Sequence, residues 1–206
     1  MKNNKLYFEN LAVYSRALLD SLPIEKEVQP LDYAVNKLYN ELKFRCSTES
    51  DIISKLWDPD MVRTNSNMPV GLNTLGLLID RFTILIIKEW CLKNKKNDDD
   101  KASNLYETQT KEIINALAFC SQGNSSINSK ITNIKTEITA NTWEEAFYNI
   151  LAINLVLWES QEVLYIKDIS VLPPEELRDY IKWFAHGNMQ RNVLIEIAEK
   201  KYWEKL

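Results

Sequence analysis

Residues 69–92, PVGLNTLGLLIDRFTILIIKEWCL, form the most apolar stretch of the chain and decide its fold. The length of this stretch approaches the roughly 20 residues that a transmembrane helix requires. However, Asp80 and Arg81 lie near its middle and Lys88 follows, and charges at such positions make an isolated membrane span costly. A helix that is apolar on nearly every side belongs at the centre of a bundle. We therefore expect 69–92 to be the central helix of an all-α fold, with no membrane span.

The composition favours long helices. The chain has 206 residues, of which 45% are hydrophobic and 26% charged, as is ordinary for a globular protein large enough to bury a core. It contains only 4 glycines and 6 prolines, whereas sheet proteins use many glycines in tight turns. We expect a single domain over 1–206, built as a bundle of five to seven helices.

Capping and breaking residues mark where the other helices begin and end. Thr142 and Glu145 form a capping box, and Pro173 and Pro174, followed by two acidic residues, start the last helix, which Gly187 could bend. Residues 130–139 could form a weak helix or a short strand. The further expected helices are 4–21, 31–45, a short one within 47–57, 105–120, one from 142 to about 167, and one from 174 to about 203.

Charge and cysteine usage argue against several classes of function. A net charge of −4 is unlike that of a general nucleic-acid binder, which carries a basic excess. Cys46, Cys91 and Cys120 are far apart and His186 is the sole histidine, so we expect neither a metal site nor a disulfide framework, and a cytoplasmic location fits best. No phosphate-binding glycine loop or nucleophile–histidine pair is visible. We therefore expect no cofactor, assign no catalytic residue, and leave open whether the protein is an enzyme.

Polar residues interrupt the apolar faces of three expected helices. Each helical residue advances by about 100°, so Asn73 and Asp80 almost superimpose, while Arg191 and Asn192 interrupt the inward face of the last helix. Burying such groups without partners costs roughly 1–3 kcal/mol each, so we expect them to meet. The predicted interior cluster consists of Asn73, Asp80, Arg81, Asn154, Gln161, Asn188, Arg191 and Asn192.

This cluster has two interpretations. It could be a closed network that only fixes which helix packs against which. Alternatively, it could line a pocket between helices in which a polar ligand completes the hydrogen bonds. In that case Glu159 or Glu162 could supply an acid or a base beside Arg191, and His186 could reach the rim.

Three segments of the chain resemble a group of bacterial all-helical domain families of unknown function. The segments are 74–90 (TLGLLIDRFTILIIKEW), 154–165 (NLVLWESQEVLY) and 188–199 (NMQRNVLIEIAE). In those families an acidic pair after the tryptophan is followed by arginine, whereas this chain has no arginine there. Their genes tend to lie among glycosyltransferase genes for surface polysaccharides. The positions that the resemblance marks are Asp80, Arg81, Lys88, Asn154, Trp158, Glu159, Glu162, Asn188, Arg191 and Asn192.

The cluster and the resemblance together suggest a cytoplasmic accessory or small-ligand-binding protein of surface-polysaccharide biosynthesis. Its ligand would be a small anion or a sugar nucleotide, and nucleic acid is not an expected partner. The alternative is a non-catalytic helical interaction module, with a protein partner or a second copy, whose polar network is only structural. The candidate ligand-binding residues are Asn73, Asp80, Arg81, Lys88, Asn154, Trp158, Glu159, Gln161, Glu162, Asn188, Arg191 and Asn192.

Overall fold

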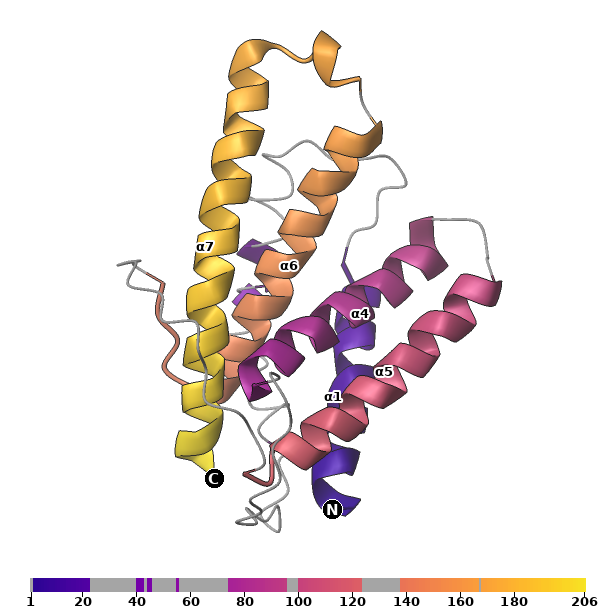
Figure 1. The fold of residues 1–206 in the computed structure, drawn as a ribbon, viewed down its shortest axis with the longest axis vertical. Coiled ribbons are helices and arrows are strands. Elements are labelled where there is room, and N and C mark those ends of the chain that lie inside the picture. Colours follow the sequence, from indigo (N-terminus) through magenta and orange to yellow (C-terminus); the bar gives the residue numbers. More distant parts are fainter. Residues whose placement is uncertain are drawn as a thin grey trace.

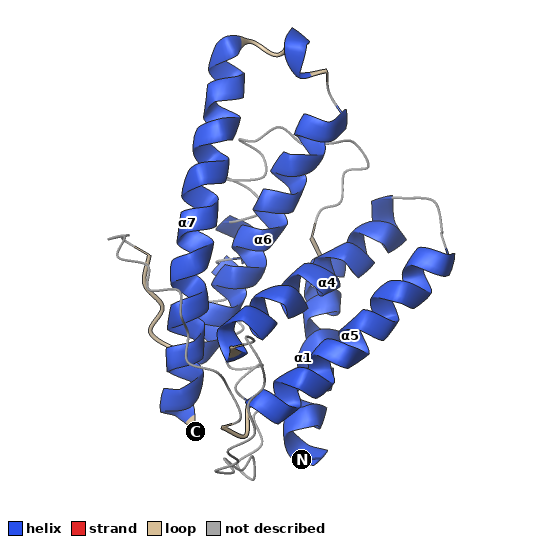
Figure 2. Cartoon of the chain, viewed as in Figure 1, coloured by secondary structure: helices blue, strands red, loops and turns tan. Residues whose placement is uncertain are grey.

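The protein is all-α throughout the residues that its computed structural model describes (Figures 1 and 2). The described residues are 2–22, 40–42, 44–45, 55, 74–95, 100–123, 138–166 and 168–206. Most of the expected helices at 31–45 and 47–57, and most of the ambiguous segment 130–139, fall outside them; the parts of the two helices that are described, 40–42, 44–45 and 55, are helical. Helices are the only regular secondary structure in the described ranges, so the prediction of an all-α bundle is confirmed.

Five long α-helices and one short 3-10 helix make up most of the described part of the fold. They are α1 (Lys2–Asp20), α4 (Leu75–Lys95), α5 (Asp100–Cys120), α6 (Trp143–Ile166), the 3-10 helix η2 (Ile169–Val171) and α7 (Pro174–Lys205). In Figure 1, α4 and α5 run antiparallel as one hairpin, and α6 and α7 form a second, longer hairpin. Helix α1 packs against both α4 and α5. None of these helices combines the length and the apolar character needed to cross a membrane.

Helix α4 occupies the central position that its sequence predicted, because it contacts α1, α5, α6 and α7. Its first described helical residue is Leu75. The most completely buried helix, however, is α6. Between residues 143 and 160 every side chain is buried except those of Glu145 and Trp158, which are half-buried. Helix α6 is therefore enclosed on nearly every side, and in α4 only Arg81 and Lys93 are exposed between residues 75 and 94.

The predicted starts of the last two long helices match the structure. At the start of α6, the Thr142 hydroxyl accepts a hydrogen bond from the Glu145 backbone N–H at 3.1 Å. The Glu145 carboxylate in turn accepts one from the Asn141 backbone N–H at 2.8 Å. Pro174 begins α7, with two glutamates in the first turn. Helix α7 continues through Gly187 without a break.

Aromatic side chains from α1, α6 and α7 meet in the core. The Phe8 ring stacks on Tyr202, with centroids 6.2 Å apart, and Trp143 meets the Tyr202 ring edge-on at 5.1 Å. The Trp143 indole N–H donates a 2.6 Å hydrogen bond to the Tyr7 hydroxyl. Helices from both ends of the described chain are thus joined through one aromatic group.

Candidate functional site

Four polar side chains meet where α4 crosses α6 and α7. The side-chain amide of Asn154, on α6, donates to the Asp80 carboxylate and to the Thr83 hydroxyl, each at 2.9 Å. The Thr83 hydroxyl donates to the Asp80 backbone carbonyl at 2.8 Å. Since an amide nitrogen carries two hydrogens, both donors of Asn154 are used. The three residues are buried and fix α4 against α6.

Arg191 completes this junction from α7, but only loosely. Its Nε lies 3.8 Å from the nearer Asp80 carboxylate oxygen, which is an ion pair beyond hydrogen-bonding distance. The Nε atom is buried and makes no hydrogen bond to any other described residue. The side chain as a whole is 28% exposed, so the guanidinium is partly open to solvent. We call Asp80, Thr83, Asn154 and Arg191 the junction cluster.

Two glycines allow the helices to approach closely on either side of Arg191. A Cβ on Gly76 would lie 2.6 Å from the backbone oxygen of Ile195, so α4 and α7 are in direct backbone contact there. A Cβ on Gly187 would lie 2.9 Å from the Leu157 side chain. These two contacts lie about one turn after and one turn before Arg191. They hold α7 against α4 and α6 at the level of the junction cluster.

Two residues predicted for the interior lie on the surface instead. Arg81 is exposed, because it follows Asp80 by one residue and about 100° of helical rotation turns it away from the junction. Gln161 is exposed at the end of the buried part of α6, where its amide donates to the Tyr165 hydroxyl at 2.7 Å. The prediction of an interior position was wrong for both. Asn73, also predicted, lies outside the described residues.

The remaining polar residues of α6 and α7 lie near the junction cluster without joining it. Asn188 is half-buried, and its side-chain amide donates to the Phe184 carbonyl one turn earlier in the same helix. Asn192 is half-buried beside Arg191. Glu159 is buried on α6, and Asp80 is the carboxylate that pairs with Arg191.

Lys88, Trp158 and Glu162 form a separate contact among α4, α5 and α6. The Lys88 ammonium lies over the rings of Tyr106 and Trp158, 5.7 and 5.9 Å from their centroids. The Trp158 indole N–H donates to Glu162 at 3.2 Å. Lys88 also lines a hollow of about 420 Å³ between α4 and α5, together with the exposed Arg81. The predicted site residues are thus divided between the junction cluster and this second contact, and each of the two places involves a different part of α4.

The described residues offer no metal site. His186 is exposed on α7. Among the described residues, no group of three or more His, Cys, Asp or Glu side chains could hold a metal ion.

The thiol of Cys120 is unreactive. Burial raises the pKa of the Cys120 thiol to about 11, and the nearby Glu199 carboxylate adds to this shift. A thiol with so high a pKa is a poor nucleophile near neutral pH.

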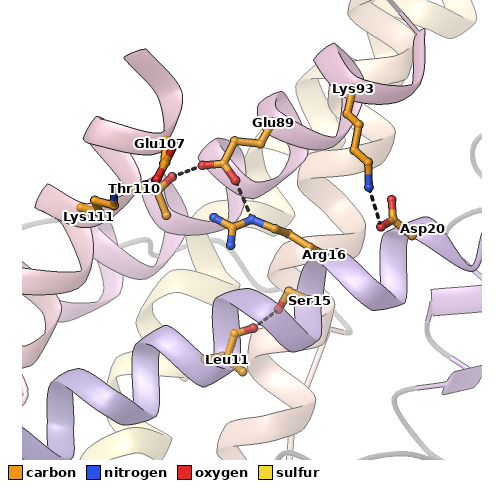
Figure 3. Close-up of polar contacts among 9 residues, drawn as sticks. All are labelled: Leu11, Ser15, Arg16, Asp20, Glu89, Lys93, Glu107, Thr110 and Lys111. Atoms are coloured by element: carbon orange, nitrogen blue, oxygen red, sulfur yellow. Dashed lines mark hydrogen bonds and ion pairs between the residues drawn. The ribbon is translucent and has the colours of Figure 1, made fainter. Parts of the chain in front are cut away.

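A second polar cluster joins α1, α4 and α5, and the sequence analysis did not single it out (Figure 3). The Arg16 Nε donates to one carboxylate oxygen of Glu89 at 2.5 Å, and the Thr110 hydroxyl donates to the other at 2.6 Å. The available sequence signal was an arginine, Arg16, inside the apolar pattern of the first helix. No pattern in the sequence pairs it with an acid 73 positions away.

No protein-family model, curated protein or solved structure shows significant similarity to this chain. The family resemblance therefore stays a prediction.

Proposed function

We propose that the protein binds a small phosphorylated sugar or sugar nucleotide at the junction cluster, as a cytoplasmic accessory protein of surface-polysaccharide biosynthesis. The observation that carries this proposal is the state of Arg191. A guanidinium has five N–H donors, yet Arg191 makes only a 3.8 Å ion pair with Asp80 among the described residues. Phosphate and carboxylate oxygens accept two parallel hydrogen bonds from such a group.

The neighbours of Arg191 favour a ligand that carries hydroxyls as well as a negative charge. The Asp80 carboxylate accepts hydrogen bonds only, and it would repel a ligand that presented nothing but anionic oxygens. Sugar hydroxyls donate to a carboxylate, whereas a phosphate on the same molecule would pair with the guanidinium. The half-buried amide of Asn192 adds both a donor and an acceptor nearby. This combination supports a phosphorylated sugar over a simple anion.

The cytoplasmic location and the link to surface polysaccharides are supported by observations other than the state of Arg191. Cys91 and Cys120 are free thiols in the described structure, which is typical of a reducing compartment. The link to surface polysaccharides comes only from the three resembling segments.

Ligand-dependent thermal unfolding tests the proposal directly. Wild type, Arg191→Ala and Arg191→Lys would be melted with hexose 1-phosphates, UDP-sugars and GDP-sugars. A ligand at about 100 times its Kd stabilises by about 2.7 kcal/mol, which raises Tm by roughly 5–10 °C in a domain of this size. Arg191→Ala should abolish the shift, and Arg191→Lys should reduce it because lysine cannot pair bidentately.

The matched control is Arg178→Ala, which removes an exposed arginine from the same helix. This variant should keep the full ligand shift. If no ligand of these classes shifts the melting of the wild type, or if Arg178→Ala loses the shift as completely as Arg191→Ala, the proposal fails.

One observation favours the alternative of a non-catalytic interaction module. The end of the α6–α7 hairpin, which extends beyond α4 and α5 in Figure 1, carries several large exposed apolar side chains. They are Tyr165, Ile169, Val171 and Ile181. Light scattering after size exclusion would detect a dimer, and Val171→Asp should dissociate it. Leu105→Asp, at another exposed apolar position on α5, is the control. A monomeric wild type would exclude the second-copy form of this alternative.

A further inference from the structure

Two hollows in the surface meet at Arg16, away from the residues of the junction cluster. The larger, of about 470 Å³, lies between α1 and α5 and includes Lys5 and Lys111 in its lining. The smaller, of about 380 Å³, extends toward Glu89 on α4. Arg16 and Glu107 line both hollows. Volumes of this size are typical of small-molecule sites.

The Arg16 side chain is held in one orientation by its neighbours. Glu89 is 16% exposed at its side chain, and its two oxygens are taken up by the Arg16 Nε and the Thr110 hydroxyl. Figure 3 shows the two terminal nitrogens of Arg16 on the side of the guanidinium that faces away from Glu89. The bond to Glu89 is the only hydrogen bond that Arg16 makes in the described part of the chain. The outer edge of the guanidinium is thus preorganised and available for pairing.

The larger hollow is lined by charged groups of both signs. Its lining includes three cations, Lys5, Arg16 and Lys111, and two carboxylates, Glu9 and Glu107, and Glu89 balances the charge of Arg16 from behind. Lys5–Glu9 and Lys111–Glu107 are exposed pairs within single helices, and such pairs contribute only a few tenths of a kcal/mol. Either lysine can therefore turn to a ligand at little cost.

The larger hollow also has an apolar part. Ala12 and Val13 of α1 and Ile114 of α5 line it, and of these Val13 is 63% exposed. An inorganic ion would leave the Val13 side chain in contact with water. A ligand with an apolar body beside its charged group would cover Val13 as well as pair with Arg16.

We propose that this groove binds a small organic anion whose carboxylate or phosphate pairs with the outer edge of Arg16 and whose apolar part covers Val13. Lys111 assists by charge, and Glu89 acts as a positioning residue through Arg16. The site shares no residue with the junction cluster and does not depend on the function proposed there.

The test uses four probes: inorganic phosphate, acetate, phenyl phosphate and benzoate. Binding is followed through the Arg16 Nε–H resonance in ¹⁵N-correlated NMR spectra, assigned by its loss in Arg16→Gln. We expect saturable shifts with phenyl phosphate or benzoate at concentrations on the order of 10 mM or below, and weaker binding of the two inorganic or short-chain partners. The stronger of the two aromatic probes identifies the anionic group that the site prefers.

Matched variants decide whether the groove is responsible, with binding followed by calorimetry. Arg16→Gln should weaken binding at least tenfold, and Lys111→Gln about threefold, while Arg178→Ala, at an exposed arginine of α7, should leave it unchanged. Thr110→Val keeps every charge but releases one oxygen of Glu89, and it should weaken binding while broadening the Arg16 resonance. The proposal is overturned if none of the four probes saturates, or if binding survives unchanged in both Arg16→Gln and Lys111→Gln.

Discussion

The Trp143 indole N–H and the Tyr7 hydroxyl form a 2.6 Å hydrogen bond that ties α6 to α1 inside the core. Both side chains are 1% exposed, and burial raises the pKa of Tyr7 well above its ordinary value, so its hydroxyl is neutral. Tyr7→Phe leaves a buried indole N–H without this acceptor. We expect the free energy of unfolding to fall by about 1–3 kcal/mol, measured by urea denaturation.

Tyr14→Phe serves as the control for Tyr7→Phe. The Tyr14 hydroxyl is half-buried and accepts a longer bond, 3.0 Å, from Tyr148. Removing it should cost less than about 1 kcal/mol because the bond is longer, and because the Tyr148 hydroxyl that remains can rotate toward another acceptor, which an indole N–H cannot do. An equal or larger loss in Tyr14→Phe would contradict the importance of the buried pair.

The two interface glycines should respond differently to alanine. In Gly76→Ala the new methyl group would meet the backbone oxygen of Ile195 at 2.6 Å, so α4 and α7 must separate. In Gly187→Ala it meets the end of the Leu157 side chain, which can shift, and alanine gains about 1 kcal/mol of helix propensity over glycine. We expect Gly76→Ala to lose about 1–3 kcal/mol and Gly187→Ala to stay within about 1 kcal/mol of wild type. Thermal and urea unfolding would rank them, and the reverse order would refute the argument.

A double-mutant cycle on Asp80 and Asn154 tests the junction cluster as a structural unit. Asn154→Ala removes the amide that bonds the buried carboxylate, and we expect a loss of about 2–4 kcal/mol. The same change in the background of Asp80→Ala should cost less, with a coupling of about 0.5–3 kcal/mol. A coupling near zero would mean that the 2.9 Å contact contributes nothing to stability.

Cys120 should react slowly in the folded protein and weaken the fold at high pH. Its pKa is raised from an ordinary value near 9 to about 11, so the folded state favours the neutral thiol. The stabilisation from this group is complete below about pH 9 and is lost as the pH rises toward 11, because the unfolded chain ionises first.

Two measurements check this behaviour of Cys120. At pH 8, peptide mapping after iodoacetamide treatment should show labelling on the order of 100-fold slower in the folded than in the urea-unfolded protein. Between pH 9 and 11, the urea midpoint should fall more steeply in wild type than in Cys120→Ala. Equal slopes would mean that the thiol does not contribute to alkaline unfolding.

The sequence was most informative about features that depend on interactions between residues close together in the chain. Thr142 with Glu145, and Pro174 with its acidic successors, marked two helix starts because capping depends on residues within one turn. The meeting of Asp80 with Asn154 also followed from the cost of burying polar groups. The enclosure of α6 was harder to anticipate, because an apolar helix pattern does not tell how many neighbours the helix has.

The sequence predictions failed where they depended on the rotation of a helix about its axis or on contacts between residues far apart in the chain. Asp80 and Arg81 are adjacent, and periodicity alone cannot decide which of them faces inward when both flank an apolar stripe. Gln161 continues the periodicity of α6, but it lies beyond the buried part of that helix. Arg16 and Glu89 are 73 residues apart, and no pattern in the sequence pairs them.

The stacking of Phe8 on Tyr202 has a consequence for the synthesis of the protein on the ribosome. At about 5–20 residues per second, translation separates these two rings by roughly 10–40 s. Throughout that interval α1 has already emerged while the helix that completes its core has not been made. Until then the aromatic side chains of α1 are exposed and prone to aggregate. They become buried only when the last turns of α7 pack against them.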